Sequence, residues 1–541
     1  MEKKKENLQS NNMLKQNLLL QISNKSIKYL GKSQSTKQNG ITLIALVVTI
    51  VVLLILAGIT ISLVLSDNGI IKKAQEAANK TQEALENEQS RLNELYDELT
   101  NVMNNTTEEP SDPVSLLADG SYSELMGVNT PDIDNGALTP IVYDETANNG
   151  KGAWVQTESN SNWYSYAATD KKWANAIVGG TFNDDGTLDE SATGYSMFVW
   201  IPRFSYQIKS GYHQSGTEIN SITPAEGTGT IEIEFMKGIS NEGATGKSIL
   251  EYNGNTTSNY SQFPNGYVIH PAFNYGETVS GIWVAKFEAS PAGATTDVAD
   301  SQYNGTDKTL QVKPGISSWR SITISNMYDV CKAYNSRLNS HLMKNDEWGA
   351  VAYLSKSKYG KETEEVWINN SSSYITGSAG NSSSATKDEG TDTNYTSSQG
   401  VKASTTGNVY GIYDMSGGAW EYVAAYIDNE NVTAYGNSLY TSTDAKTKNV
   451  YTKASTDNDT NNYNQNAGVY GDAIYETSSN SSTPLSQSWH TDCSYFPNMS
   501  SPFFGRGGMC DTISGAGLFA FTSGTGYNDN YVSFRPVLAV L

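Results

Sequence analysis

The feature that most constrains this chain is an uninterrupted apolar stretch near its N-terminus. Residues 41–65 read ITLIALVVTIVVLLILAGITISLVL, which is 25 consecutive positions without a charged side chain. As a helix this stretch would be roughly 37 Å long at about 1.5 Å per residue, and a hydrocarbon core is about 30 Å thick. It therefore predicts a transmembrane helix. The alternative is a cleaved secretory signal, whose apolar region is usually shorter, about 7–15 residues.

Charge is divided sharply on either side of this stretch. Residues 1–40 hold eight lysines and two glutamates, whereas the whole 541-residue chain has a formal net charge of -21. Lysine before an apolar span and acid after it follow the positive-inside rule. We therefore expect a single-pass protein of the cell membrane, in contact with membrane lipid, with a cytoplasmic N-terminus and an extracellular head. The acidic excess argues against nucleic acid as a partner, because like charges repel.

The residues after the apolar stretch predict a stalk and a linker. Residues 66–104 are polar but carry apolar side chains every seven positions, which is typical of a self-associating helix. An amphipathic helix that lies on its own head is the alternative. The segment 105–114 is polar, contains prolines and predicts a linker. The seven-residue positions are Ile71, Ala78, Leu85, Leu92 and Leu99.

From residue 115 the chain has short strand-like runs separated by Gly, Asn and Ser turns. We expect a β and loop lead-in region over 115–194 and one large head over 195–541. With the N-terminal transmembrane helix and the stalk, this predicts the fold class α+β. The strand-like runs are 198–201, 206–208, 231–235, 267–269 and 282–287.

Two segments of the head predict helices. One is 325–335, with Ser325 as its N-cap, and the other is 345–354, with Trp348 facing inward. The segments 369–407 and 440–485 are rich in Ser, Thr and Asn and predict exposed loops.

The charged leader ends in Gly40 and is followed by Ile41 and the long apolar stretch. This arrangement resembles a type IV prepilin signal. The resemblance implies cleavage by a prepilin peptidase between Gly40 and Ile41, and methylation of the new N-terminus. The family usually has glutamate at the fifth mature position, where this chain has Ala45. Because that glutamate is associated with pairing the new amino group, its absence argues against incorporation into a filament.

Aromatic and glycine-rich motifs recur in the C-terminal half: SWRSIT from Ser318, the segment 345–354, YGIYDMSGGAWEY over 410–422 and SFRPVL from Ser533. Together they resemble the formylglycine-generating enzyme and sulfatase-modifying-factor family, which has a C-type-lectin-like fold. Their tryptophans, Trp319, Trp348 and Trp420, predict large buried rings. Asp414 and Glu421 are interpreted as turn and strand-edge hydrogen-bonding residues rather than as an acid–base pair.

The sequence argues against an enzyme. Oxidase members of that family use two neighbouring cysteines, whereas no second cysteine follows Cys510. The four histidines are scattered without metal-ligand spacing, and the chain has no nucleotide-binding or nucleophile-elbow motif. We expect no catalytic residue, no metal and no cofactor, with structural calcium as an alternative. The cysteines allow either a Cys493–Cys510 disulfide or ordinary packed thiols.

Residues 500–541 alternate framework-like glycine, arginine and phenylalanine with aromatic and small polar side chains. This region resembles the variable region of diversity-generating retroelement target proteins, in which a rigid scaffold displays substituted positions on one face. Tyrosine and small polar groups supply contact area and hydrogen bonds at modest entropic cost. Ordinary surface loops are the alternative. The residues expected to contact a ligand are Met509, Cys510, Asp511, Thr512, Phe521, Thr522, Tyr527, Asp529 and Tyr531.

These features predict a membrane-anchored, pilin-like surface protein whose head binds an unknown protein or glycan ligand. The alternative is a minor pilin or pseudopilin, a structural component of a type IV pilus or secretion assembly. A neighbouring reverse-transcriptase gene would favour the first function, and a nearby prepilin peptidase with an assembly ATPase would favour the second.

Overall fold

The structure is a computed structural model, and it describes most of the chain after residue 127. The leader, the apolar stretch, the stalk and the linker lie outside the described residues, and so do Gly40, Ile41 and Ala45. The described residues are 128–159, 163–210, 230–241, 243, 249–250, 267–428, 435–466, 468–478 and 488–541.

The predicted fold class is wrong. The described residues form mainly strands and loops, joined by short helices. In this part of the chain no helix has both the length and the apolar character needed to cross a bilayer. That finding contradicts the transmembrane helix and helical stalk of the predicted fold class, and also the predicted single-pass location in the cell membrane. The segments on which those predictions rest, 41–65 and 66–104, lie outside the described residues.

The largest sheet has seven strands in the order β12-β18-β9-β4-β3-β1-β2, each antiparallel to its neighbours. Its central strands β4 and β9 are buried along their whole length, as continuous runs of Phe, Val, Trp and Ile predict. Trp200 of β4 lies opposite Trp283 of β9, with ring centroids 5.3 Å apart. Gly281 allows this packing, because a Cβ there would lie 2.3 Å from the Trp200 ring. The strands are β1 (Thr139–Asp144), β2 (Ala153–Gln156), β3 (Asn175–Val178), β4 (Ser196–Pro202), β9 (Gly281–Ala285), β12 (His341–Leu342) and β18 (Pro536–Leu538).

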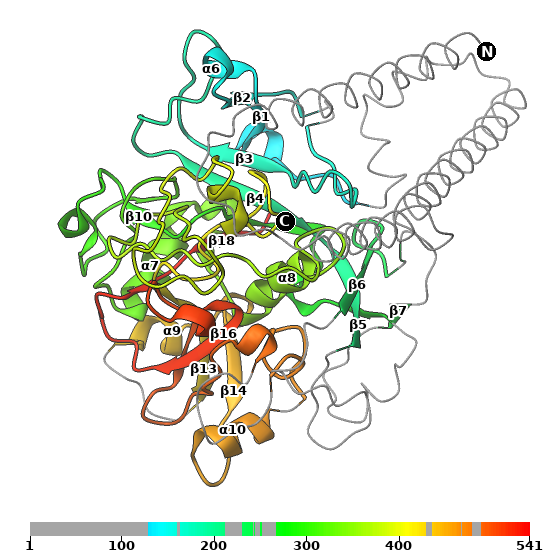
Figure 1. The fold of residues 1–541 in the computed structure, drawn as a ribbon. Coiled ribbons are helices and arrows are strands. Elements are labelled where there is room, and N and C mark those ends of the chain that lie inside the picture. Colours follow the sequence, from blue (N-terminus) through cyan, green and yellow to red (C-terminus); the bar gives the residue numbers. More distant parts are fainter. Residues whose placement is uncertain are drawn as a thin grey trace, which may run out of the picture. The chain divides into compact units, whose positions relative to one another are not determined.

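The second sheet has five strands and contains most of the C-terminal region (Figure 1). Its long strand β13 pairs with β15 on one side and with β14 and β17 on the other. From β17 the chain continues directly into β18 of the seven-stranded sheet, so its last ten residues connect the two sheets. The strands are β13 (Trp420–Asp428), β14 (Asn449–Thr452), β15 (Phe503–Gly507), β16 (Gly517–Gly524) and β17 (Val532–Ser533).

Two smaller sheets and several short helices complete the described fold. The sheets are β6-β5-β8-β7 and β10-β11. Their strands are β5 (Phe204–Ser210), β6 (Thr230–Phe235), β7 (Ile249–Leu250), β8 (Tyr267–Ile269), β10 (Ser290–Pro291) and β11 (Leu310–Gln311). The α-helices are α6 (Ala147–Gly150), α7 (Ile324–Tyr334), α8 (Asn345–Ser355), α9 (Asn437–Thr441) and α10 (Asp459–Gln465). The 3-10 helices are η1 (Asp134–Gly136), η4 (Pro271–Phe273), η5 (Val298–Ser301), η6 (Ser336–Leu338), η7 (Gly400–Ala403), η8 (Ala445–Thr447), η9 (Trp489–Thr491) and η10 (Ile513–Gly515).

The two helices predicted in the head are confirmed as α7 and α8, but their N-caps differ from the prediction. The N-cap of α7 is Thr323, whose hydroxyl accepts a hydrogen bond from the backbone N–H of Asn326, rather than Ser325. Helix α8 is buried along its whole length. Its Trp348 is fully buried and donates from Nε1 to the carbonyl oxygen of Leu518 on β16, at 2.7 Å. Helix α8 therefore supports the five-stranded sheet directly.

The Ser, Thr and Asn-rich segment 369–407 has little regular structure, as predicted, but it is not an exposed loop throughout. Asn369 and Asn370 are 1% and 0% exposed, and Thr376 is fully buried. The Asn369 amide donates to the carbonyl oxygen of Ile375 and to the carboxylate of Asp414, both at 2.8 Å. These side chains supply hydrogen bonds to buried polar groups of a segment without regular structure. Composition alone does not reveal this role.

Candidate ligand-binding face

The candidate site lies where the chain crosses from the five-stranded to the seven-stranded sheet. Arg535, between β17 and β18, is 1% exposed and donates to both carboxylate oxygens of Glu421 on β13, with Nε 2.7 Å from Oε2. Its remaining N–H groups donate to the carbonyl oxygens of Ala285 on β9 and of Tyr413, at 3.0 and 3.1 Å. The guanidinium group of Arg535 therefore connects the two sheets through hydrogen bonds to both.

Two further carboxyl groups lie near this ion pair. Asp414 takes a left-handed φ of 62° and accepts hydrogen bonds from the backbone N–H of Gly377 and Glu288. Burial raises the pKa of Asp414 and of Glu288, and it raises the pKa of Glu421 to about 6. Asp414 is thus a turn residue, as predicted. Glu421 lies inside the sheet, with β15 on one side and β17 on the other, so its assignment to a strand edge is wrong.

The loop 525–531, between β16 and β17, is held by its backbone. Four of its carbonyl oxygens accept hydrogen bonds from elements that belong to the core. This anchoring fixes the backbone of the loop, while its side chains are not needed to hold it in place. The pairs are Gly526 with the N–H of Ile324 (3.1 Å), Asp529 with the N–H of Ser321 (3.0 Å), Asn530 with the guanidinium of Arg320 (2.7 Å) and Tyr531 with the N–H of Trp420 (3.0 Å).

Exposed tyrosine rings surround this anchored loop. Tyr527 is 44% exposed and Tyr531 is 39% exposed, and Tyr435, which precedes α9, is 38% exposed. The rings of Tyr435 and Tyr527 meet edge to face, with centroids 4.9 Å apart. Partial burial, together with the hydrogen-bonded carboxylate of Asp529, raises the pKa of Tyr531. We call Tyr435, Tyr527, Asp529 and Tyr531 the tyrosine face.

The other predicted stretch, 509–512, approaches the same loop through Tyr374. The guanidinium of Arg320, which holds the carbonyl oxygen of Asn530, lies 4.1 Å from the centroid of the Tyr374 ring. The hydroxyl of Tyr374 in turn contacts Cys510. The exposed residue Asp511 follows directly. The structure thus brings both predicted stretches to Arg320, which belongs to the SWRSIT motif, and to Tyr374, which the sequence did not indicate.

Two of the predicted contact residues are buried, which corrects their assignment. Cys510 is fully buried and Phe521 is 1% exposed. On β16 side chains alternate between the two faces, so Phe521 points into the core while its neighbour Thr522 lies on the opposite, half-buried face. Neither Cys510 nor Phe521 offers a surface to a ligand.

The remaining predicted contact residues differ in solvent exposure. Met509 is half-buried against the core, and the hydroxyl of Thr512 accepts a hydrogen bond from the Met509 N–H at 2.9 Å, which closes a turn. Asp511 is exposed, and Thr522 is half-buried beside the bare backbone of Gly505. Together with Met509, Thr512, Tyr527, Asp529 and Tyr531, these two residues stay predictions as ligand contacts.

The cysteines do not form the disulfide that the sequence allowed. Cys331, Cys493 and Cys510 all belong to the described residues, and all three are buried thiols. Burial raises the pKa of Cys493 and of Cys510 to about 11. At neutral pH these groups are therefore protonated.

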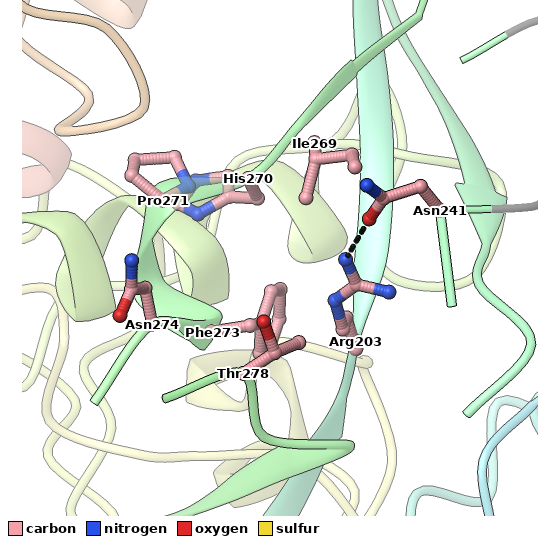
Figure 2. A pocket seen from close by; sticks show the side chains of 8 residues that line it. All are labelled: Arg203, Asn241, Ile269, His270, Pro271, Phe273, Asn274 and Thr278. Atoms are coloured by element: carbon pink, nitrogen blue, oxygen red, sulfur yellow. Dashed lines mark hydrogen bonds between the residues drawn. The ribbon is translucent and has the colours of Figure 1, made fainter. Parts of the chain in front are cut away.

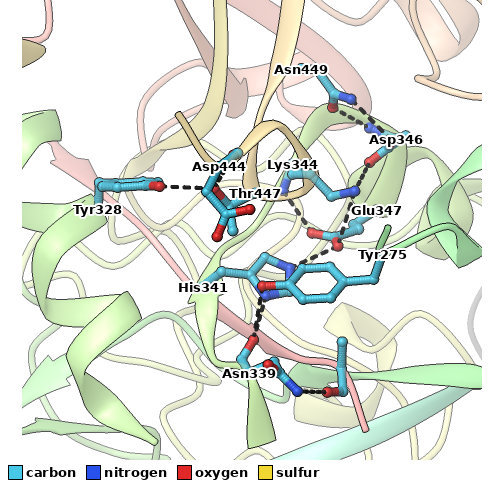
Figure 3. A network of polar contacts seen from close by, with 11 residues as sticks. Tyr275, Tyr328, Asn339, His341, Lys344, Asp346, Glu347, Asp444, Thr447 and Asn449 are labelled. Carbon is cyan, nitrogen blue, oxygen red and sulfur yellow. Dashed lines mark hydrogen bonds and ion pairs between the residues drawn. The ribbon is translucent and has the colours of Figure 1, made fainter. Parts of the chain in front are cut away.

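A buried polar network holds the N-terminus of α8 (Figure 3). Glu347 accepts hydrogen bonds from Nε2 of His341 and from the backbone N–H of Lys344, both at 2.8 Å. Burial opposes ionisation of Glu347, but the neighbouring His341 and Lys344 hold its pKa below the ordinary value. The ring of Tyr275 stacks on His341, with centroids 4.7 Å apart.

A hollow of about 380 Å³ lies near β5 and β8, away from the tyrosine face (Figure 2). Its lining includes Arg203, whose guanidinium donates to the carbonyl oxygen of Ser240 and to Oδ1 of Asn241. It also includes His270, which is 1% exposed and whose pKa burial lowers to about 3. None of the predicted ligand-contact residues lines this hollow.

Comparison with known proteins assigns the chain to no family. No model of a known protein family matches it, and no curated protein has a significantly similar sequence.

Proposed function

We propose that this chain binds a protein ligand through the tyrosine face. The observation that carries the proposal is the exposure of three tyrosine rings on and beside a loop whose backbone the core holds at four points. An aromatic ring exposed to water is unfavourable unless a partner covers it, and tyrosine adds a hydroxyl group for hydrogen bonding.

The anchoring of the 525–531 loop favours tight binding. A loop that is already ordered loses little conformational entropy when a partner docks, so more of the contact energy appears as affinity. Tyrosine contributes a large contact area with few rotatable bonds, and the carboxylate of Asp529 adds an acceptor beside the Tyr531 ring. A protein surface that carries basic and polar groups around an apolar patch would match this face.

The resemblance of 500–541 to variable regions of retroelement target proteins supports the same proposal. Under that proposal the buried Cys510 and Phe521 belong to the constant framework. Positions 511, 522, 527, 529 and 531 would be the substituted ones, because changes there leave the core packing intact.

The test is to screen the purified full-length chain against an array of secreted and surface-displayed proteins and to measure each positive by biolayer interferometry. The double variant Tyr527→Ala/Tyr531→Ala removes two central rings, and we expect it to weaken binding by at least about tenfold, as for aromatic hot spots. The control is Val450→Ala, which removes an exposed apolar side chain of β14, outside the tyrosine face, and should leave the dissociation constant unchanged. The proposal fails if the array yields no ligand, or if every ligand binds the double variant as tightly as the wild type.

A further inference from the structure

A second hollow, of about 430 Å³, lies among segments that the sequence did not mark as functional. It is lined by the β1–β2 connection, the loop 183–190 and the residues 394–396. Its size falls in the range of small-molecule sites, about 300–1,000 Å³. None of the residues of the tyrosine face lines it.

Two hydrogen bonds that start from the core orient the carboxylate of Glu190, an exposed residue that lines this hollow. Trp154, which is fully buried, donates from Nε1 to the hydroxyl of Tyr395 at 2.7 Å, and that hydroxyl donates to Oε1 of Glu190 at 2.8 Å. The loop is tied to β2 by a hydrogen bond from the N–H of Leu188 to the carbonyl oxygen of Trp154, at 2.7 Å. One oxygen of Glu190 is thereby fixed, and Oε2 has no hydrogen-bond partner among the described residues.

The rim offers both donors and acceptors. The amide nitrogen of Asn183 donates to Thr187 at 3.0 Å, which leaves its Oδ1 as an acceptor. Asn394 shows the opposite arrangement, since its Oδ1 accepts from Thr396 and its Nδ2 remains a donor. Lys151, from the β1–β2 connection, adds an ammonium group to the lining. Within the described residues, Oδ1 of Asn183, Nδ2 of Asn394 and Nζ of Lys151 make no hydrogen bond.

One aromatic ring forms part of the wall. Tyr143 packs over Gly152, where a Cβ would lie 2.2 Å from the tyrosine hydroxyl, so a side chain at residue 152 would displace the ring. Gly152 and the neighbouring Asn148 both take left-handed φ values, 80° and 51°. Glycine and asparagine both tolerate this conformation, so the β1–β2 connection can turn sharply beside the hollow.

This lining excludes several kinds of ligand. An apolar molecule would leave the amides and the carboxylate without partners, which is costly. An anion would be repelled by Glu190 and Asp185, and a metal ion is disfavoured because the described residues contain no cluster of three or more His, Cys, Asp or Glu side chains. A neutral ligand whose groups both donate and accept hydrogen bonds remains.

We propose that this hollow binds a neutral sugar ring. Each sugar hydroxyl both donates and accepts, so it matches an amide next to a carboxylate, and the C–H face of the ring matches the flat side of Tyr143. In this arrangement Glu190 and Asn183 accept from hydroxyl groups, while Asn394 and Lys151 donate to them. The site is independent of the tyrosine face and does not rest on the proposed protein ligand.

The test uses the full-length chain and free galactose, mannose and N-acetylglucosamine, each titrated in saturation-transfer NMR. We expect a dissociation constant of about millimolar for at least one of these sugars, which is typical of a single shallow site. Glu190→Gln removes an acceptor while keeping the shape of the side chain, and it should weaken binding by about tenfold or more. Inorganic phosphate, titrated in parallel, should not compete.

Glu145→Gln is the matched control, because Glu145 is exposed and does not line the hollow. It should bind the sugar like the wild type. Asn183→Ala, at an exposed rim position, is a second variant that removes an acceptor away from the Tyr395 hydrogen bond, and it should also weaken binding. The proposal is overturned if none of the three sugars binds, if Glu190→Gln and Asn183→Ala bind like the control, or if phosphate displaces the sugar.

Discussion

At the scale of single residues, this protein buries an unusual number of acidic side chains within hydrogen-bonding contacts. Glu476 is fully buried and accepts from the hydroxyl of Tyr206 at 2.8 Å and from the N–H of Gly471 at 2.7 Å, with Tyr353 as a third donor. Burial raises its pKa from 4.5 to about 7 despite these donors. The folded protein therefore holds this proton more tightly than the unfolded chain does.

This residue predicts a pH dependence of stability. The contribution of Glu476 is full below its ordinary pKa of 4.5 and is lost as the pH rises through about 7. Glu476→Gln cannot titrate, so its free energy of unfolding relative to the wild type should rise by about 2–3 kcal/mol between about pH 5 and about pH 8. Urea unfolding followed by tryptophan fluorescence measures this difference.

Glu145→Gln is the control for that measurement, because Glu145 is exposed. The difference between Glu476→Gln and the wild type should change with pH far more than the difference for this control. A constant difference for Glu476→Gln at both pH values would contradict the prediction.

At the scale of secondary-structure elements, helix α8 depends on buried charge at its first turn. Glu347 compensates His341 and Lys344, whose side chains are 0% and 3% exposed. The network also reaches β14, since the backbone N–H of Asp346 donates to Asn449 at 3.2 Å. Because Trp348 extends from the same helix to β16, loosening this turn would disturb the sheet that carries the tyrosine face.

Removing one partner from this network should be costly. Glu347→Ala leaves the buried His341 ring without its carboxylate partner and the buried Lys344 ammonium group with Asp346 alone, at 3.4 Å, and we expect a loss of about 3–5 kcal/mol in the free energy of unfolding. Glu145→Ala makes the same chemical change at an exposed position and should cost about 0.5 kcal/mol or less. Equal losses for the two variants, measured by chemical denaturation, would show that the network does not stabilise α8.

At the scale of the whole described structure, the two large sheets meet at Arg535. Its guanidinium contacts Glu421 of the five-stranded sheet and the carbonyl oxygen of Ala285 of the seven-stranded sheet. The crossing from β17 to β18 occurs at the same point. We therefore expect the two sheets to unfold together rather than separately.

A double-mutant cycle tests this connection. Arg535→Met leaves Glu421 buried without its cation and should cost about 3–5 kcal/mol, whereas Arg535→Met/Glu421→Leu removes both charges and should cost less than the two single changes together. Far-UV circular dichroism and tryptophan fluorescence should report one coincident transition for the wild type. Additive effects, or two separate transitions, would contradict a shared junction.

Local patterns in the sequence were sufficient to predict individual strands and helices of the head. The runs at 198–201 and 282–287 became β4 and β9, and the two predicted helices became α7 and α8, because apolar periodicity and capping act over a few residues. The burial of Trp319, Trp348 and Trp420 was also predictable, since large aromatic rings lose most by staying in water. The predicted fold class and membrane location, however, were inferred for the whole chain from one local pattern, the apolar stretch 41–65. The described residues contradict both predictions.

The candidate site was decided by tertiary structure. The resemblance to variable regions of retroelement target proteins predicted a binding region at 500–541 but could not separate the buried Cys510 and Phe521 from the exposed Tyr527 and Tyr531. That separation depends on how β16 pairs with β15 and on which residues anchor the 525–531 loop, and these anchoring residues lie some hundred or more positions earlier in the chain. Tyr435 and the sugar-sized hollow escaped prediction for the same reason. Apolar periodicity determines which segments form strands and helices, but a surface is made by contacts between segments far apart in sequence, and only the folded chain specifies these.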